Sequence, residues 1–88
     1  MGLSDAFKSP LRTKIMEFYS ENPSCIETSR GIAAWLAVDR RRAKKALEEL
    51  TEYRILLAHR TSFATGYSYT QNKSIIKAVD KYIKGVKR

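Results

Sequence analysis

One segment of this 88-residue sequence, residues 39–52, constrains the fold more than any other. Its apolar residues recur at the spacing of one helix face: Ala43, Ala46, Leu47 and Leu50. Asp39 stands where a helix cap is expected. Five bases occupy the first two turns and three glutamates the last two, which is the reverse of what the helix dipole favours. Because like charge near a helix end costs about 0.3 to 1 kcal/mol per residue at low salt, the pattern indicates an external anion, and nucleic-acid phosphate is the first candidate.

The positive charge of the chain is concentrated in two stretches. The formal net charge is +8, and residues 30–45 and 73–88 each hold six bases and one acid. Charge of this sign favours polyanions, namely DNA, RNA, an anionic membrane surface or an acidic partner. The longest uncharged apolar run, residues 32–38, has seven residues, against the roughly 20 that span a bilayer. We therefore expect a soluble, cytoplasmic protein that has no membrane partner, and the single Cys25 fits a reducing compartment.

The remaining pattern predicts a mainly helical domain with a small β-hairpin. Expected in order are a helix between Ser9-Pro10 and Asn22-Pro23, a very short strand at 25–27, a helix capped by Thr28 or Ser29 and reaching about Leu36, the helix after Asp39, hairpin strands at 55–60 and 67–70, and a helix capped by Asn72. We assign residues 1–8 to an N-terminal tail, 9–84 to the domain and 85–88 to a basic C-terminal tail.

This order of elements resembles the winged helix-turn-helix superfamily of DNA-binding proteins, of the prokaryotic transcriptional-regulator type, over roughly residues 9–84. The local signature is residues 31–39, Gly-Ile-Ala-Ala-Trp-Leu-Ala-Val-Asp, followed by Ala43, Leu47 and Leu50. The resemblance implies a three-helix core, a two- to three-stranded antiparallel wing and a C-terminal helix. Ala37 and Arg54 depart from the family, which often has glycine at these places. Both are therefore candidates for a positive φ.

The resemblance also implies that the third helix enters the major groove of duplex DNA while the wing touches the backbone or the minor groove. On the third helix it nominates Arg40, Arg41, Lys44 and Lys45, with Arg42 nearer the flank. On the wing it nominates Arg60, Thr61 and Thr65. At the amino end of the second helix, Ser29 and Arg30 can present backbone N–H groups to a phosphate.

Other interpretations of the same residues stay open. Lys44 and Lys45 could instead pair with the glutamates four positions on, which would make a solvated face. Trp35 is expected as partly buried core, and Phe63 either contacts DNA sugar or a partner chain, or folds back on the hairpin. Two alternative functions follow, a winged helix that docks an acidic protein through Trp35 or Phe63, and one that binds RNA.

The sequence lacks the residue groups that catalysis and metal binding need. His59 is the only histidine, no cysteine pair is present, and no glycine-rich phosphate loop occurs. We therefore expect no enzymatic activity, no catalytic residue, no metal, no cofactor and no small-molecule ligand. The last helix carries a lysine stripe beside its apolar face, and a homodimer through the terminal helices is possible.

Overall fold

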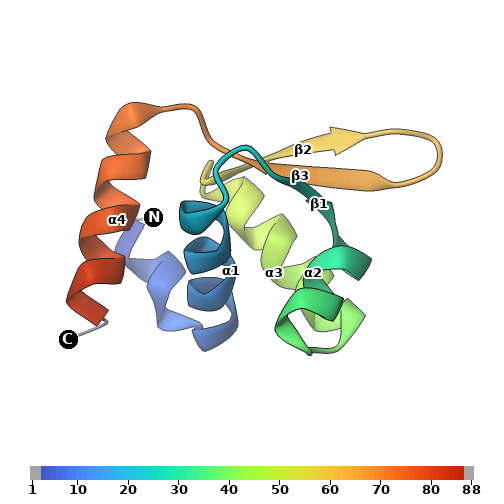
Figure 1. The fold of residues 1–88 in the computed structure, drawn as a ribbon, viewed down its shortest axis with the longest axis horizontal. Coiled ribbons are helices and arrows are strands. Elements are labelled where there is room, and N and C mark those ends of the chain that lie inside the picture. Colours follow the sequence, from blue (N-terminus) through green and yellow to red (C-terminus); the bar gives the residue numbers. More distant parts are fainter. Residues whose placement is uncertain (1–2, 87–88) are drawn as a thin grey trace.

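The computed structural model describes residues 3–86, which form one helical body with a sheet that projects from it (Figure 1). The elements are η1 (Leu3–Lys8), α1 (Pro10–Glu21), β1 (Ile26–Thr28), α2 (Ser29–Leu36), α3 (Arg40–Glu52), β2 (Leu56–Arg60), β3 (Thr65–Tyr69) and α4 (Lys73–Val86). This confirms the expected winged helix architecture of a three-helix core, an antiparallel wing and a C-terminal helix.

Local capping fixes where the helices begin. The Ser9 hydroxyl accepts a hydrogen bond from the backbone N–H of Arg12, and Pro10 occupies the first turn of α1. Thr28 rather than Ser29 caps α2, because its hydroxyl accepts from the N–H of Gly31 at 3.1 Å. The Asp39 carboxylate caps α3. The Asn72 side chain accepts from the first turn of α4.

The apolar faces of the three core helices meet in one cluster. α3 buries the four residues predicted for its inner face, Ala43, Ala46, Leu47 and Leu50. α1 contributes Leu11, Ile15, Met16 and Tyr19. α2 contributes Ile32, and α4 covers the far side with Val79 and Ile83. α3 is therefore anchored along its whole inner face, and its opposite face is available to solvent.

The sheet is antiparallel with the strand order β1-β3-β2. β2 and β3 form the hairpin of the wing, in which Leu56 opposes Tyr69 and Arg60 opposes Thr65. Tyr67 and Tyr69 point into the core, and the Tyr19 hydroxyl donates a hydrogen bond of 2.6 Å to the Tyr67 carbonyl. The wing extends beyond the helices at the end of the molecule opposite α4 (Figure 1).

Two turns adopt the left-handed conformation that the sequence suggested. Ala37, after α2, has a φ of 54°, and Arg54, after α3, has a φ of 64°. In each turn, the backbone N–H of the next residue donates a hydrogen bond to a carbonyl in the last turn of the helix. Val38 donates to Ala33 and Ile55 donates to Leu50, both at 3.0 Å. The chain thus keeps the helix-ending geometry that glycine usually provides, at a cost of about 1 kcal/mol for each non-glycine residue.

The N-terminal residues differ from the predicted tail. Residues 3–8 form the 3-10 helix η1, and Ala6 is completely buried. The Arg12 side chain donates to the carbonyls of Asp5 and Ala6 at 2.8 and 3.0 Å, and Phe7 stacks on Tyr82 of α4. A single short 3-10 helix shows no periodicity, so the sequence pattern did not reveal it. Residues 1–2 of the expected tail lie outside the described part.

The C-terminal boundary and Trp35 also differ from expectation. α4 continues to Val86, so the expected basic tail is helical at residues 85–86, while residues 87–88 lie outside the described part. Trp35 was expected in the core, but 68% of it is exposed and its ring meets only the edge of the core at Phe18. α2 is short, and its inward position is filled by Ile32. Within residues 3–86, no helix has the length and apolar character needed to cross a bilayer.

Candidate nucleic-acid interface

The five bases of α3 are all exposed, and none of them forms an ion pair with a described residue. The pairs considered from the sequence, Lys44 with Glu48 and Lys45 with Glu49, do not form. Glu48 instead pairs with Arg60 of the wing at 2.9 Å, and Glu49 pairs with Arg12 of α1 at 3.1 Å. Glu48 and Glu49 therefore hold α3 to the wing and to α1. The bases in its first half keep their charge available to an external ligand.

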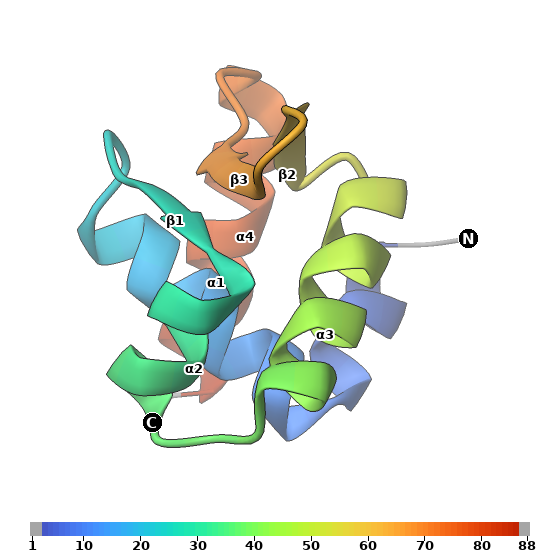
Figure 2. The ribbon, with the colours of Figure 1, turned by 90° about the vertical axis from the view of Figure 1, so that its right-hand side faces the viewer.

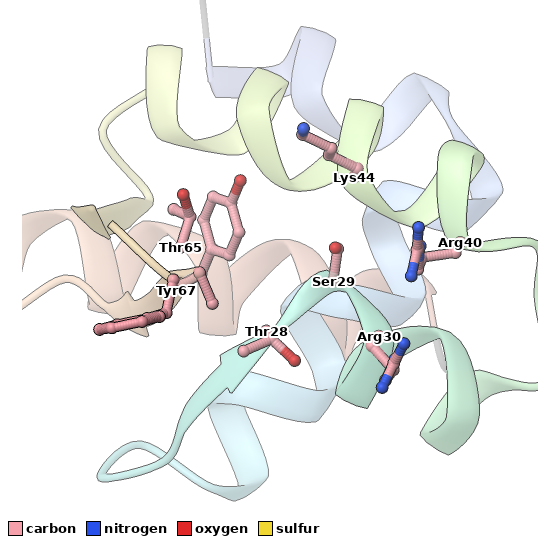
Figure 3. Close-up of a pocket in the computed structure, with 9 residues that line it drawn as sticks. Thr28, Ser29, Arg30, Arg40, Lys44, Thr65 and Tyr67 are labelled. Atoms are coloured by element: carbon pink, nitrogen blue, oxygen red, sulfur yellow. The ribbon is translucent and has the colours of Figure 1, made fainter. Parts of the chain in front are cut away.

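A groove of about 500 Å³ runs between α3, the start of α2 and the wing. Five nominated residues line it, namely Ser29, Arg30, Arg40, Lys44 and Thr65. Four further residues complete it, namely Thr28, Phe63, Ala64 and Tyr67. In Figure 3, Arg30 and Arg40 lie at one end of the groove, and Thr65 and Tyr67 lie at the other. The groove therefore has a cationic end formed by two helices and an uncharged end formed by the wing.

The remaining bases of α3 lie outside this groove. Arg42 and Lys45 border a separate hollow of about 320 Å³ between α1 and α3, together with Arg12 and Glu49. Arg41 borders neither hollow and is exposed on the outer face of α3. Figure 2 shows α3 along one side of the molecule, with strands β2 and β3 of the wing near the C-terminal end of α3. The five bases of α3 thus cover a wider part of the helix surface than the part that lines the groove.

Arg60 of the wing is held by α3. Its guanidinium donates two hydrogen bonds to the Glu48 carboxylate, at 2.9 and 3.2 Å, and the Tyr67 hydroxyl donates to the same carboxylate. The hydrogen bonds from Arg60 and then Tyr67 lower the pKa of Glu48, and the pKa of Arg60 is raised by the same contact. Burial and the hydrogen bond to Glu48 raise the pKa of Tyr67 to about 12. Arg60 therefore fixes the wing against α3 in this structure.

The hydroxyl of Thr61 is also used within the wing. It donates to the Ala64 carbonyl at 2.8 Å and accepts from the N–H groups of Phe63 and Ala64 at 3.2 and 3.1 Å. A hydroxyl offers one donor and two acceptor sites, so these contacts saturate it. Thr61 shapes the loop at the wing tip, whereas Thr65 faces the groove.

The amino end of α2 forms one wall of the groove. The Thr28 cap serves the N–H of Gly31, while the N–H groups of Ser29 and Arg30 lie in the first turn and have no partner within the helix. Such a terminus attracts an anion, because its N–H groups and the helix dipole both favour negative charge. The Arg30 and Arg40 side chains add two cations to the same wall.

Four residues of the site were not nominated from the sequence, namely Thr28, Ala64, Tyr67 and Glu48. Tyr67 lies 19 positions from Glu48 in the sequence, and Arg60 lies 12 positions from it. No local sequence pattern therefore predicts the hydrogen bonds among these three side chains. For Phe63, the sequence leaves open a contact with DNA sugar or a partner chain, or a ring that folds back onto the hairpin. Phe63 is 97% exposed and borders the groove, which excludes the alternative in which it folds back onto the hairpin. Among the described residues, no cluster of three or more His, Cys, Asp or Glu side chains could hold a metal ion.

Comparison with solved structures supports the fold. A variant of ZitR from Lactococcus lactis matches with a TM-score of 0.66 and 18% identity, over 86% of this chain and 51% of that one. The AntR antimony-specific transcriptional repressor matches with a TM-score of 0.73 and 15% identity, over 97% and 77%. The adhesin competence repressor AdcR from Streptococcus pyogenes matches with a TM-score of 0.63 and 16% identity, over 89% and 59%.

These likenesses show a winged helix fold of the kind found in transcriptional repressors. The chain spans about half the length of the ZitR variant. No protein-family model matches the chain, and no curated protein matches it by sequence.

Proposed function

We propose that this chain is a DNA-binding winged helix module that acts in transcription regulation. α3 enters the major groove of duplex DNA, and the wing rests on the adjacent backbone and minor groove. The observation that carries the proposal is the set of five exposed bases on α3 that form no ion pair with a described acid, on a helix whose nearest glutamates, Glu48 and Glu49, are paired with other elements. The similarity in fold to AntR, a transcriptional repressor, supports the same proposal.

The proposed mechanism is binding without chemistry. B-form DNA has a major groove about 12 Å wide, which admits one α-helix. Arg40 and Arg41 lie in the first turn of α3, where an arginine can donate two hydrogen bonds to a guanine edge. Lys44, Lys45, Arg42 and Arg30 are placed to neutralise phosphates on the two sides of the groove, and the N–H groups of Ser29 and Arg30 add a neutral phosphate contact.

The nominated wing residues divide into two roles in this proposal. Thr65 faces the groove and can contact the backbone, while Thr61 acts through the shape of the loop. Arg60 keeps its contact with Glu48 and contributes to DNA binding chiefly by orienting the wing. The wing thus acts as a rigid arm whose position is set by α3 itself.

A matched pair of variants tests the proposal. The first replaces Arg40, Arg41, Lys44 and Lys45 with Ala, and the second replaces Lys73, Lys77, Lys81 and Lys84 of α4 with Ala. Both remove four positive charges from exposed positions. The first variant should lose binding to a mixed-sequence duplex in a low-salt gel shift while its far-UV circular dichroism and melting curve stay near those of the wild type. The α4 variant should retain most of the affinity.

Several results would reject the proposal. If the two variants bind equally well, the interaction is a general effect of net charge and α3 has no special role. If folded RNA competes as well as duplex DNA, the RNA-binding alternative is favoured, since the A-form major groove is too narrow for a helix. If the wild type ignores duplex DNA and instead recovers a single acidic protein stoichiometrically, the protein-docking alternative is favoured.

We also propose that two copies pair through the terminal helices. Ala78, Tyr82 and Gly85 of α4, together with Lys81, border a largely apolar hollow of about 550 Å³. α4 lies at the opposite end of the molecule from the wing, so a pair formed there leaves both wings outward (Figure 1). A two-fold pair would present two α3 helices to half-sites about one DNA turn apart. Sedimentation equilibrium of the wild type and of Tyr82→Glu tests this, and a monomeric wild type would contradict it.

A further inference from the structure

The tip of the wing is an uncharged and well-braced loop. Residues 61–64, Thr-Ser-Phe-Ala, carry no ionisable side chain. Thr61 holds both ends of the loop, because its own N–H donates to the Ala64 carbonyl at 3.0 Å and its hydroxyl makes three further bonds to Phe63 and Ala64. The position of the Phe63 backbone is therefore fixed by the loop.

Phe63 projects from this loop on the side of the cationic groove. It is 97% exposed, the highest value among the large apolar side chains that the structure describes. It borders the same groove as Arg30, Arg40 and Lys44, so a polyanion seated on those bases lies against the aromatic ring. The occupant that fits both features is the duplex already required by α3.

The wing has little free charge with which to hold that duplex. Arg60, the only base between residues 55 and 72, is bound to Glu48, and the His59 ring contacts the Ser68 hydroxyl at 2.7 Å. A contact made by the tip is consequently apolar in character. In the minor groove, deoxyribose and the faces of base pairs are the apolar surfaces that DNA offers.

We propose that Phe63 is an apolar wedge, which enters the minor groove beside the segment read by α3 and partly unstacks one base-pair step. This inference rests on the proposed function and adds a deformation of the DNA to it. Apolar side chains inserted at a step from the minor groove kink the duplex toward the major groove. Pyrimidine–purine steps are the easiest to open, so the wedge selects sites that contain such a step at a fixed distance from the contacts of α3.

The test compares five proteins on one duplex, namely the wild type, Phe63→Ala, Phe63→Leu, the neighbouring control Ser62→Ala, and Lys44→Ala. The duplex has mixed sequence and about 30 base pairs, roughly three helical turns, and carries a fluorescent donor and acceptor at its two ends. Dissociation constants are measured over a series of salt concentrations, and energy transfer between the ends reports bending. Because Phe63 is exposed, its variants should melt at the wild-type temperature.

The wedge predicts a specific pattern among these proteins. Phe63→Ala should bind about tenfold more weakly at every salt concentration, since an apolar contact of this size is lost without a change in counterion release. Its plot of log K against log salt should run parallel to that of the wild type, and the rise in energy transfer should disappear. Phe63→Leu should lie between the two, and Ser62→Ala should match the wild type. Lys44→Ala should flatten the slope by about 0.9.

Three results would overturn the wedge. If Phe63→Ala binds and bends DNA like the wild type while Lys44→Ala is weakened, the wedge is wrong and the proposed function survives. If the wild type does not bind the duplex at any salt concentration, both fail together. If Phe63→Ala leaves DNA binding unchanged and abolishes self-association in sedimentation, the aromatic tip is a contact between protein chains.

Discussion

The carboxylate of Glu48 should be the main link between α3 and the wing, and Glu48→Gln removes its charge at nearly constant size. Two contacts are affected. The pair with Arg60 is largely solvated, with 59% of the Arg60 side chain and 34% of the Glu48 side chain exposed, so it contributes little to stability. The bond from the part-buried Tyr67 hydroxyl changes from a charged to a neutral acceptor, which costs about 1 kcal/mol. The expected loss is therefore about 1 kcal/mol, and it comes mainly from the Tyr67 bond.

Urea denaturation measures this loss, and Glu52→Gln provides the matched control. Glu52 lies in the last turn of the same helix, is exposed, and forms no ion pair with a described residue. Its substitution should stay within about 0.5 kcal/mol of the wild type. A double-mutant cycle of Glu48→Gln with Tyr67→Phe should give a coupling of about 1 kcal/mol. A coupling near zero would show that the two side chains are neighbours without energetic consequence.

The pH dependence gives an independent check of the same network. The pKa of Glu48 is lower in the folded protein than its ordinary value of 4.5, because Arg60 and Tyr67 donate to the carboxylate. A lowered pKa stabilises the fold above the ordinary value, and this stabilisation is lost as the pH falls through the lower, folded value. The difference between wild type and Glu48→Gln should therefore be full at neutral pH and shrink below pH 4.5. A difference that does not shrink would refute the electrostatic explanation.

Two further predictions concern turns and buried hydroxyls. Ala37→Gly and Arg54→Gly should each raise the free energy of unfolding by about 0.5 to 1 kcal/mol in urea denaturation. The reason is that the native φ values of 54° and 64° strain a residue that has a side chain. Destabilisation by both substitutions would show that neither turn is strained. Tyr19→Phe should lower the melting temperature, since it removes the hydrogen bond that the Tyr19 hydroxyl donates to the Tyr67 carbonyl, at a cost of about 1 kcal/mol. Tyr69→Phe should be neutral or stabilising, because the Tyr69 hydroxyl is buried with no hydrogen-bond partner among the described residues. Equal losses from the two tyrosine substitutions would contradict this assignment.

The features that were predictable from the sequence are those decided by neighbours along the chain. The caps at Ser9, Asp39 and Asn72 depend on side chains three residues or fewer from the groups they serve. The inner face of α3 follows from helical spacing, whereas the left-handed turns at Ala37 and Arg54 were expected from the resemblance to a family that often has glycine at these places.

The features that the sequence did not reveal depend on contacts between distant segments. The pairing of Arg12 with Glu49 spans 37 positions, and only the packing of α1 on α3 creates it. η1 is too short to show a period, yet Ala6 completes the core. The sequence identified the bases of α3 but not their division, in which Arg40 and Lys44 face the groove while Arg42 and Lys45 face α1. That division depends on where α2, the wing and α1 lie around the helix.

The salt dependence of binding to a mixed-sequence duplex tests the central claim most directly. The four bases proposed to neutralise phosphates, Arg30, Arg42, Lys44 and Lys45, are all exposed. If all four do so, log K should fall with log salt at a slope of about −3.6, at about 0.9 for each phosphate contact. Affinity that does not change with salt, or no duplex binding even in dilute buffer, would contradict the assignment of α3 as a DNA-binding helix.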